Sequence, residues 1–334
     1  MKVFVFEYIT GGGMLDSPLP PSLAEEGDMM VRALVSDLAE IAGIEVLATR
    51  DARLGQPDVP IDFHMLNSLE AFPEAWRRCM ELADAVWPIA PEYACVLQRI
   101  SEIVIQQGKP LLNSPPQAVQ TTSSKRLTSM CLRERGIPVV PTYRFEDGVP
   151  DRPGSWVLKP DDGAGCQGIM ICRDRDDLQR QFEALPLDKQ YVVQPFVQGA
   201  PTSLNILTHN GEALVLGINQ QRVAMTSNGF VLLGCVVNGH VKNKARFHKL
   251  AREVVAAIPG LWGIIGVDLL DTEDGLQVLE VNPRITTSYA GLKESTGINP
   301  AALVLDLLAG KRPLKSQIPN GSVVDVNLEY AGVA

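Results

Sequence analysis

Apolar runs alternate with helical patterns along the first hundred or so residues. Short runs rich in β-branched and aromatic residues predict strands at residues 2–7, 45–49, 85–89 and 110–113. Longer stretches with apolar residues on one face predict helices at 21–41, 69–82 and 92–107. Strand–helix alternation is typical of a parallel sheet covered by helices, so the chain is expected to begin with an α/β domain.

The pattern changes after Ser114-Pro115-Pro116. A helix is predicted over 123–135, and Gly136 and Pro138 provide its stop signal. Hairpins follow, because Asn210-Gly211, Asn238-Gly239 and Asp274-Gly275 are turn pairs between apolar runs, with one further helix over 244–257. We therefore expect an α+β remainder with antiparallel sheets, and domains at 1–115, 116–195 and 196–334.

Composition restricts the classes of function. The chain has 334 residues, a formal net charge of −9 and a sequence pI near 5.1, so nucleic acid and anionic membranes are disfavoured partners. No uncharged stretch is long enough for a transmembrane helix, and the N-terminus lacks the apolar core of a signal peptide. The six cysteines form no C-x-x-C pair and the four histidines show no zinc spacing, which indicates reduced thiols in a cytoplasmic protein.

A glycine-rich segment at 163–168 matches the letters G-x-G-x-x-G. A dinucleotide-binding fold needs a helix directly after this loop, whereas here an apolar, strand-like segment follows. Strand, glycine loop and strand are typical of a flap that closes over nucleotide phosphates, and Lys159 just before the loop favours that interpretation over a plain hairpin turn. Cys166 in the loop has no nearby histidine, so it is not expected to be a nucleophile.

The segment GIIGVDLLDTEDGLQVLEVNPR carries the strongest constellation of polar residues. Glu280 and Asn282 share one face of a predicted strand, and a loop of about three residues ending at Gly275 would place Asp268 across from Glu280. Two carboxylates and an amide oxygen suit magnesium, which prefers a few protein oxygens together with substrate phosphates. A solvated sheet face, or a salt bridge to Arg284, is the alternative.

Arg284 lies directly after this segment, followed by hydroxyl groups that include Thr287 and Ser288. A fixed guanidinium beside a metal can hold a phosphate or carboxylate and stabilise charge that develops during phosphoryl transfer. A polar turn leading into a helix would explain the hydroxyl groups equally well.

Six segments in order make the chain resemble the ATP-grasp superfamily, from about residue 116 to 284. They are Ser124-Lys125-Arg126, GIPVVPTYRF, VLKPDDGAGCQG, VVQPFVQG, GVDLL and LEVNPR. The resemblance implies an ATP-grasp fold preceded by a pre-ATP-grasp α/β domain. It also implies ATP and Mg²⁺ (or Mn²⁺) as cofactors, and phosphorylation of a small carboxylate substrate followed by attack of an amine on the acylphosphate.

The resemblance assigns roles residue by residue. The resemblance implies that Lys125 and Lys159 contact the ATP phosphates, and that Lys159 and Arg284 act in catalysis. The implied flap over the phosphates contains Asp162, Gly163, Gly165 and Gly168; the implied adenine contacts are Gln194, Phe196 and Val197; the implied metal ligands are Asp268, Glu280 and Asn282.

Some positions depart from the family pattern. Gln194 stands where relatives often have glutamate, and Pro201 and Thr202 occupy the region where an acidic ribose-binding residue is often found. Some relatives carry an arginine where this chain has Gly266, so Arg284 or Arg222 is expected to supply that charge.

The opening FEYITGGGM and the segment EVNPRITTSYAGL most resemble the tyramine–L-glutamate ligase group of methanofuran biosynthesis, a setting linked to tetrahydromethanopterin-dependent one-carbon pathways. This likeness implies L-glutamate as the acid and tyramine or a related amine as the acceptor. Glu7 and the glycines Gly11, Gly12 and Gly13 would then lie at the substrate site. A tight turn after the first strand is the simpler interpretation of the glycines.

Three other functions compete with this one. Another ATP-grasp amino-acid or peptide ligase would share the mechanism and differ in its substrates. A catalytically silent ATP-binding regulatory module would fit the departures at Gln194 and Pro201, but it leaves the retained lysines and carboxylates unexplained. A nicotinamide-dependent oxidoreductase rests on the glycine letters alone. Apolar residues on the N-terminal helices would also suit a homodimer face.

Overall fold

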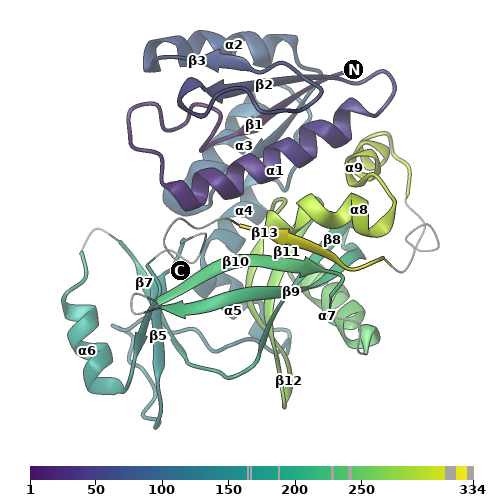
Figure 1. Cartoon of the computed structure of the whole chain (residues 1–334). Coiled ribbons are helices and arrows are strands. Elements are labelled where there is room, and N and C mark those ends of the chain that lie inside the picture. The colour runs from purple at the N-terminus through teal and green to yellow at the C-terminus, as the bar shows by residue number, and fades with distance from the viewer. Residues whose placement is uncertain are drawn as a thin grey trace.

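Three β-sheets organise the chain, with helices packed between and around them (Figure 1). The computed structural model describes residues 1–163, 165, 168–186, 189–226, 229–239, 243–312 and 321–328. Within these ranges no helix combines the length and the apolar character that crossing a bilayer requires.

The N-terminal sheet is parallel throughout, with the order β3-β2-β1-β4. Its strands are β1 (Lys2–Glu7), β2 (Glu45–Asp51), β3 (His64–Leu66) and β4 (Ala85–Ile89), and its helices are α1 (Pro21–Ala39), α2 (Phe72–Leu82) and α3 (Val96–Gln106). Alternating residues of β1 point to opposite faces. Val3 and Val5 belong to the core formed with α1, whereas Phe4 and Phe6 belong to the core formed with α2 and α3.

Two details of this domain differ from the sequence prediction. The predicted strand at 110–113 is reduced to one bridge between Val86 and Leu111, and the fourth strand is instead β3, which is too short to show an alternating pattern. The helix predicted from 92 begins at Val96, because Ala94 and Cys95 adopt φ of 50° and 58°, which a right-handed helix cannot contain.

The helix predicted over 123–135 is confirmed as α5 (Lys125–Arg133), and a helix that was not predicted, α4 (Pro116–Ser123), precedes it. Ser124 separates them with an extended backbone, and its hydroxyl caps α5 by accepting from the N–H of Leu127. The break places Lys125 in the first turn of α5.

A small antiparallel sheet with the order β6-β5-β7 follows, packed against α6 (Arg175–Glu183). Its strands are β5 (Trp156–Pro160), β6 (Met170–Cys172) and β7 (Tyr191–Pro195). The prediction that two strands enclose the glycine-rich segment is confirmed, since β5 and β6 pair on either side of it.

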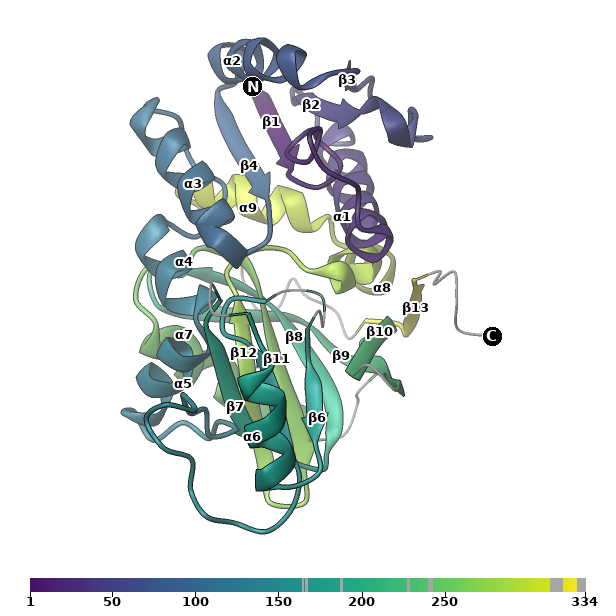
Figure 2. The same cartoon turned by 90° about the vertical axis from the view of Figure 1, so that its left-hand side faces the viewer.

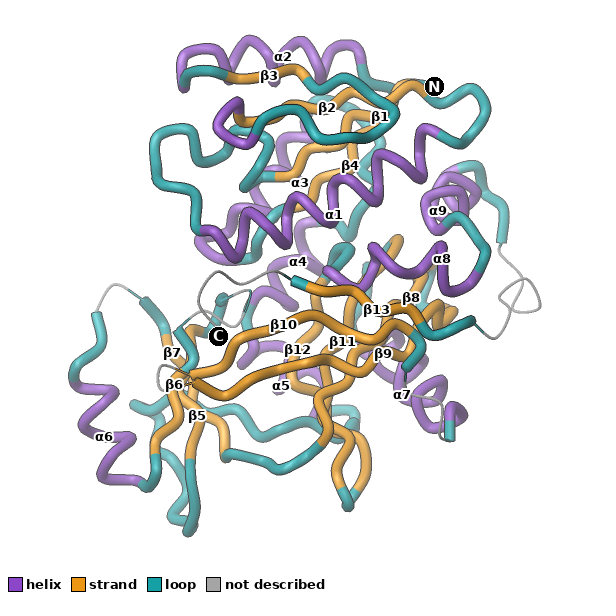
Figure 3. Tube along the Cα trace, viewed as in Figure 1, coloured by secondary structure: helices purple, strands orange, loops and turns teal. Residues whose placement is uncertain are grey.

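The third sheet is antiparallel and has the order β12-β11-β8-β9-β10-β13, with α7 (Lys244–Ala257) against one face (Figures 1 and 3). Its strands are β8 (Ala200–His209), β9 (Glu212–Thr226), β10 (Gly229–Val237), β11 (Gly263–Thr272), β12 (Gly275–Asn282) and β13 (Val324–Asn327). Asn210 and Gly211 join β8 to β9 with φ of 51° and 78°, as predicted. The hairpin predicted at Asn238-Gly239 is wrong, because the next element after β10 is α7.

The largest core cluster joins the two ends of the chain. Side chains of β1 and α1 pack with those of α8 (Leu292–Thr296) and α9 (Pro300–Leu308), which lie against α1 in Figure 2. Polar contacts reinforce this packing. The Tyr289 hydroxyl donates to Asp37 Oδ2 at 2.9 Å, and the Asn299 amide donates to the Asp37 carbonyl at 2.7 Å.

Replacing Tyr289 with Phe tests how much this link stabilises the fold. Both partners are buried, so Tyr289→Phe leaves Asp37 Oδ2 without its hydroxyl donor and should lower the free energy of unfolding by about 1–3 kcal/mol. Chemical denaturation measures the difference. Tyr191→Phe removes the same atom from a half-buried ring of the small sheet and should change stability much less; equal losses in both variants would contradict the assignment.

Candidate active site

A β-bulge sets the geometry of the carboxylate hairpin. The turn between β11 and β12 pairs Thr272 with Gly275, a register that would place Asp268 opposite Leu279. An irregularity next to Asp268 shifts the register, and Glu280 becomes its partner. Bulges re-aim side chains in this way beside functional sites. The sequence prediction that Asp268 lies across from Glu280 is confirmed, although the turn is shorter than expected.

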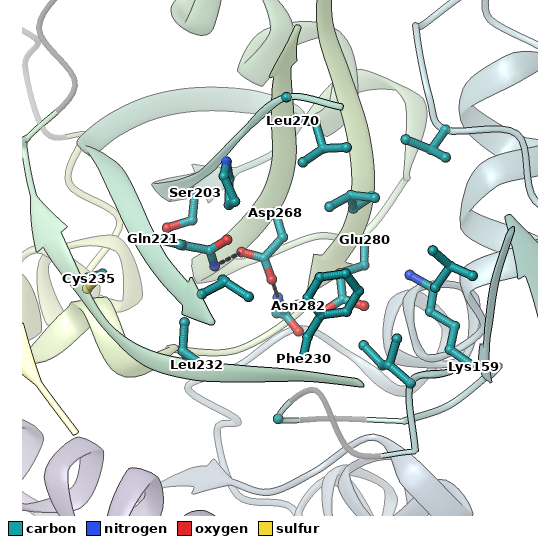
Figure 4. Close-up of a pocket in the computed structure, with 18 of the residues that line it drawn as sticks. Lys159, Ser203, Gln221, Phe230, Leu232, Cys235, Asp268, Leu270, Glu280 and Asn282 are labelled. Atoms are coloured by element: carbon teal, nitrogen blue, oxygen red, sulfur yellow. Dashed lines mark hydrogen bonds between the residues drawn. The ribbon is translucent and has the colours of Figure 1, made fainter. Parts of the chain in front are cut away.

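Asp268 is held by two amide groups in the central cavity (Figure 4). Gln221 Nε2 donates to its Oδ1 at 2.9 Å, and Asn282 Nδ2 donates to its Oδ2 at 3.0 Å. Burial, together with the negative charge of Glu280, raises the pKa of Asp268 to about 7. Both causes disfavour a negative charge on Asp268, and a bound cation would offset them.

Glu280 has cations on its other side. Its Oε2 lies 3.5 Å from Lys125 Nζ, and Lys159 is also close enough to act on its charge. Burial alone would raise the pKa of Glu280, but the charges of Lys125 and Lys159 hold it below its usual range. Lys125 Nζ also donates to the carbonyl of Gly163 at 2.7 Å, so this lysine links Glu280 to the glycine-rich segment.

A cavity of about 320 Å³ opens between the small sheet and the large sheet, with α1 contributing to its wall. Eleven of the residues predicted from the sequence line it: Lys159, Gly165, Gln194, Phe196, Val197, Asp268, Glu280, Asn282, Arg284, Thr287 and Ser288. One region of the wall is apolar and is formed by Val140, Val157, Ile169, Val223, Phe230, Leu232, Leu270 and Leu279, while further polar residues in the wall include Glu26, Ser203 and Gln221. A cavity with one apolar region and one charged region suits a ligand that has a flat base and phosphates.

The polar contacts of the predicted adenine segment are partly used within the protein. Gln194 is buried and its Nε2 donates to the Thr142 hydroxyl at 2.8 Å. The backbone N–H of Phe196 donates to the Ser155 carbonyl at 2.9 Å, so this N–H is not available to a ligand. Phe196 can therefore contribute its ring or carbonyl group, and Val197 follows it in the cavity wall.

The glycine-rich segment is anchored at both described ends. Asp162 Oδ2 accepts from the N–H of Ala94 at 3.0 Å, and Gly168 adopts φ of +69° beside Pro160. Ala164, Cys166 and Gln167 lie outside the described residues. Asp161, which the sequence interpretation passed over, accepts from the Ser124 hydroxyl at 2.6 Å and from the Arg126 N–H at 2.9 Å. It ties the end of β5 to the start of α5 and so positions Lys125.

Arg284 is buried among carboxylates from the N-terminal domain. Its Nη2 donates to Glu92 Oε2 at 2.9 Å, and the charges of Glu26 and Glu7 also act on it. Neither Glu26 nor Glu92 was predicted as a site residue. Both lie on the far side of a domain boundary from Arg284 in the sequence, so no spacing rule relates them.

The hydroxyl groups that follow Arg284 connect the cavity wall to α1 and to β8. Thr287 Oγ1 donates to Glu26 Oε2 at 3.2 Å, and Ser288 Oγ donates to Asn205 Oδ1 at 2.9 Å. Thr287 thus meets the N-terminal domain, while Ser288 is fixed to the large sheet.

Arg222 does not line the cavity. Strand residues alternate between faces, and its neighbours Gln221 and Val223 are the ones that point inward. The Arg222 guanidinium instead donates to Asp325 at 2.9 Å and to the carbonyl of Val326 at 2.8 Å, both in β13. Arg222 therefore holds the edge strand β13 against the large sheet.

Glu7 and the triple glycine also lie away from the cavity wall. Glu7 Oε2 accepts from the N–H and hydroxyl of Thr10 at 2.5 and 2.7 Å. A Cβ on Gly11 would lie 2.3 Å from the Glu7 carbonyl, one on Gly13 would lie 2.3 Å from the Tyr8 ring, and Gly12 has φ of +111°. These glycines form the tight turn that the sequence analysis kept as an alternative.

The donors around Asp268 and Glu280 fit a magnesium ion that is shared with a ligand. Among the described residues there is no group of three or more His, Cys, Asp or Glu side chains that could enclose a metal. Two facing carboxylates beside an amide provide the few protein oxygens that magnesium needs when phosphates complete its coordination.

Comparisons with known proteins agree with this geometry. The family model of an ATP-grasp domain matches residues 122–288, half of the chain, and that of a pre-ATP-grasp domain matches residues 44–119. Tyramine–L-glutamate ligase of Methanocaldococcus jannaschii is 25% identical over 305 residues, which cover 89% of this chain and 86% of the relative.

Two solved structures share the fold. An ATP-grasp superfamily protein from Archaeoglobus fulgidus has a TM-score of 0.70 at 21% identity, with 98% of this chain and 100% of that chain covered. The complex of biotin carboxylase from Campylobacter jejuni with β,γ-ATP has a TM-score of 0.72 at 16% identity, with 95% of this chain and 73% of that chain covered. Both likenesses concern the fold, and they include the domain that precedes the ATP-grasp core.

Glu7 generates a prediction about pH. Burial raises the pKa of Glu7 from 4.5 to about 7, so the unfolded chain loses this proton at a lower pH than the folded protein does. The contribution of Glu7 to the free energy of unfolding should therefore fall by roughly 3 kcal/mol as the pH rises from about 4.5 to 7. Glu7→Gln should remove this fall, because a neutral amide oxygen still accepts from Thr10.

Urea denaturation of both proteins between pH 5 and pH 8 measures the effect. Glu134→Gln, a change at an exposed glutamate after α5, serves as the control and should follow the wild-type profile. A Glu7→Gln variant that is less stable than wild type at pH 8 would show that Glu7 is ionised and stabilising in the folded protein.

Proposed function

Because the chain belongs to the ATP-grasp family, we propose that it is an ATP-dependent carboxylate–amine ligase that works through an acylphosphate. One observation carries this proposal: Lys159 and the facing carboxylates Asp268 and Glu280 line the charged region of a cavity whose other region is apolar, and Lys125 contacts Glu280 at 3.5 Å. This arrangement suits the base, the phosphates and the magnesium ion of a nucleotide.

We propose one orientation for the nucleotide in the cavity. The adenine ring would lie among the apolar side chains near Phe196 and Leu279, and the phosphates would reach Lys125 and Lys159. The flap around Gly163 and Gly165 would cover them, since glycine allows backbone N–H groups to approach phosphate oxygens. The two lysines already act on one carboxylate, so phosphates would enter a field prepared for negative charge.

Asp268, Glu280 and Asn282 would hold magnesium between the carboxylates and the phosphates. The ion would supply positive charge that offsets the charge of the phosphates and of the two acidic side chains. Gln221 and Asn282 orient the Asp268 carboxylate through hydrogen bonds, which limits its movement when a ligand binds.

The reaction itself requires mainly positioning and charge stabilisation. A carboxylate oxygen of the acid substrate attacks the γ-phosphorus of ATP, and ADP leaves. The amine nitrogen then attacks the acyl carbon, and phosphate leaves as the C–N bond forms. Lys159 would stabilise the transferring phosphoryl group, and Arg284, in the same cavity wall, would hold the acid or its phosphate.

For the substrates we propose L-glutamate and tyramine or a related amine. The support is the likeness to tyramine–L-glutamate ligase over most of both chains. Another amino-acid pair would use the same residues for ATP and magnesium and would change only the part of the cavity near Arg284 and Thr287.

The first test is ADP release from the purified protein with ATP and magnesium, measured across a panel of acids and amines. We expect ADP with L-glutamate and tyramine together and little with either one alone. ADP with another pair would keep the ligase and change its substrates. Binding of ATP without ADP release from any pair would instead support a regulatory module.

Glu280→Gln tests the metal site. The amide keeps the shape of the side chain but removes the charge that faces Asp268 and both lysines, so kcat should fall by roughly 100-fold or more while the fold is kept. The same ADP assay measures kcat, and circular dichroism checks the fold. Glu273→Gln, at the exposed tip of the same hairpin, is the matched control and should remain active. Near-normal turnover by Glu280→Gln would refute the metal assignment.

A further inference from the structure

A polar recess lies where α1 meets the loop after β12, within the wall of the cavity. Glu26 on α1 lines the cavity and its side chain is largely buried, with 9% of the residue exposed. One carboxylate oxygen, Oε2, accepts from Thr287 Oγ1 at 3.2 Å. The other, Oε1, is fully buried and has no hydrogen-bond partner among the described residues. A buried carboxylate oxygen without a donor is costly, so this oxygen is suited to a donor that arrives with a ligand.

The unpaired oxygen, Oε1, faces the glycine-rich segment at Gly165. A Cβ placed on Gly165 would lie 3.4 Å from Glu26 Oε1 and 2.8 Å from Leu23 Cδ2. Gly165 therefore lies directly over this part of α1, and a larger residue there would press on the recess. Glu26 is thus enclosed between the N-terminal domain and the flap that is proposed to cover ATP.

Arg284 already has a carboxylate partner beside the recess. Its Nη2 lies 2.9 Å from Glu92 Oε2, and the charges of Glu26 and Glu7 also act on it. Glu7 accepts from Thr10 and packs behind Gly27, whose added Cβ would lie 2.7 Å from the Glu7 carboxyl carbon. The direct ion pair of Arg284 is therefore with Glu92, and Glu26 Oε1 is left without a donor among the described residues.

We propose that this recess binds the amino group of the amine substrate as an ammonium, with Glu26 Oε1 as its acceptor. The inference rests on the proposed ligase function and names the substrate class as a primary alkylammonium. An ammonium brings three N–H donors and one positive charge, and the unpaired oxygen of Glu26 lacks a donor. The phosphates of ATP occupy the other charged end of the cavity, at Lys125 and Lys159, so the two ligands do not compete for one site.

The location also suits the reaction. Arg284 and Thr287 lie beside Glu26 in the cavity wall, so an amine held there is next to the group proposed to hold the activated acid. The ammonium first passes one proton to Glu26 Oε1, and the free amine then attacks the acyl carbon as phosphate leaves. Glu26 is a specificity-determining residue in this scheme. It selects an acceptor that carries a cationic amino group, and it places that group on the side of α1.

Glu26→Gln tests the inference, because it removes the charge and keeps the size and the acceptor for Thr287. The KM for tyramine, measured by ADP release with saturating ATP and L-glutamate, should rise about 10- to 100-fold. The KM for ATP should stay within about twofold. Glu26→Asp keeps the charge and should recover part of the affinity for the amine.

Hydroxylamine separates this inference from the function on which it rests. It is mostly uncharged at neutral pH and traps an acylphosphate as a hydroxamate, so it needs no ammonium site. The wild type and Glu26→Gln should form hydroxamate from L-glutamate at similar rates. A wild type that gives neither hydroxamate nor ADP with any acid would overturn the ligase itself and the inference with it.

Glu25→Gln is the matched control, since it makes the same change one residue away on α1 without lining the cavity. It should keep the wild-type KM for tyramine. An active Glu26→Gln variant with unchanged KM for tyramine would overturn the inference. A rise in the KM for ATP instead would show that Glu26 faces the nucleotide, which would also overturn it.

Discussion

Two carboxylates that face each other in a buried cavity, Asp268 and Glu280, impose the central constraint on this structure. Each loses hydration, and the charge of Glu280 disfavours the charge of Asp268. The surrounding fold supplies the compensation. Lys125 stands at a helix start that exists because Ser124 breaks the preceding helix, and Lys159 stands at the end of a strand from a separate sheet. The candidate site thus depends on three segments of the chain that meet at one pair of side chains.

Local sequence was sufficient for most of this arrangement. The ATP-grasp fold and its N-terminal parallel sheet follow from apolar periodicity and from six short segments in order, and the family comparison agrees. The strands around the glycine segment and the carboxylate hairpin were also predictable, since both signals lie within about twenty residues. The domain limits at 115 and 195 remain predictions.

The remainder depended on contacts between distant segments. The bulge that brings Glu280 opposite Asp268 cannot be predicted from residue spacing. The sequence analysis reached the correct pairing by assuming a longer turn than the chain has. Arg222 was assigned to the cavity because its charge suited a ligand, yet strand alternation turns it to β13. Glu26 and Glu92 reach Arg284 only through the docking of the N-terminal domain, which no pattern near either residue reveals.

The shared core between the first and last elements has a further consequence. Because β1 and α1 pack with α8 and α9 in one cluster, the apolar side of the N-terminal domain is completed by residues that are synthesised much later. A nascent chain therefore holds that surface exposed until α9 has been made, and chaperone contact is most needed during that interval. For the same reason, a chimera that exchanges the N-terminal domain between relatives must also carry the matching α8 and α9, or its two parts will meet with mismatched surfaces.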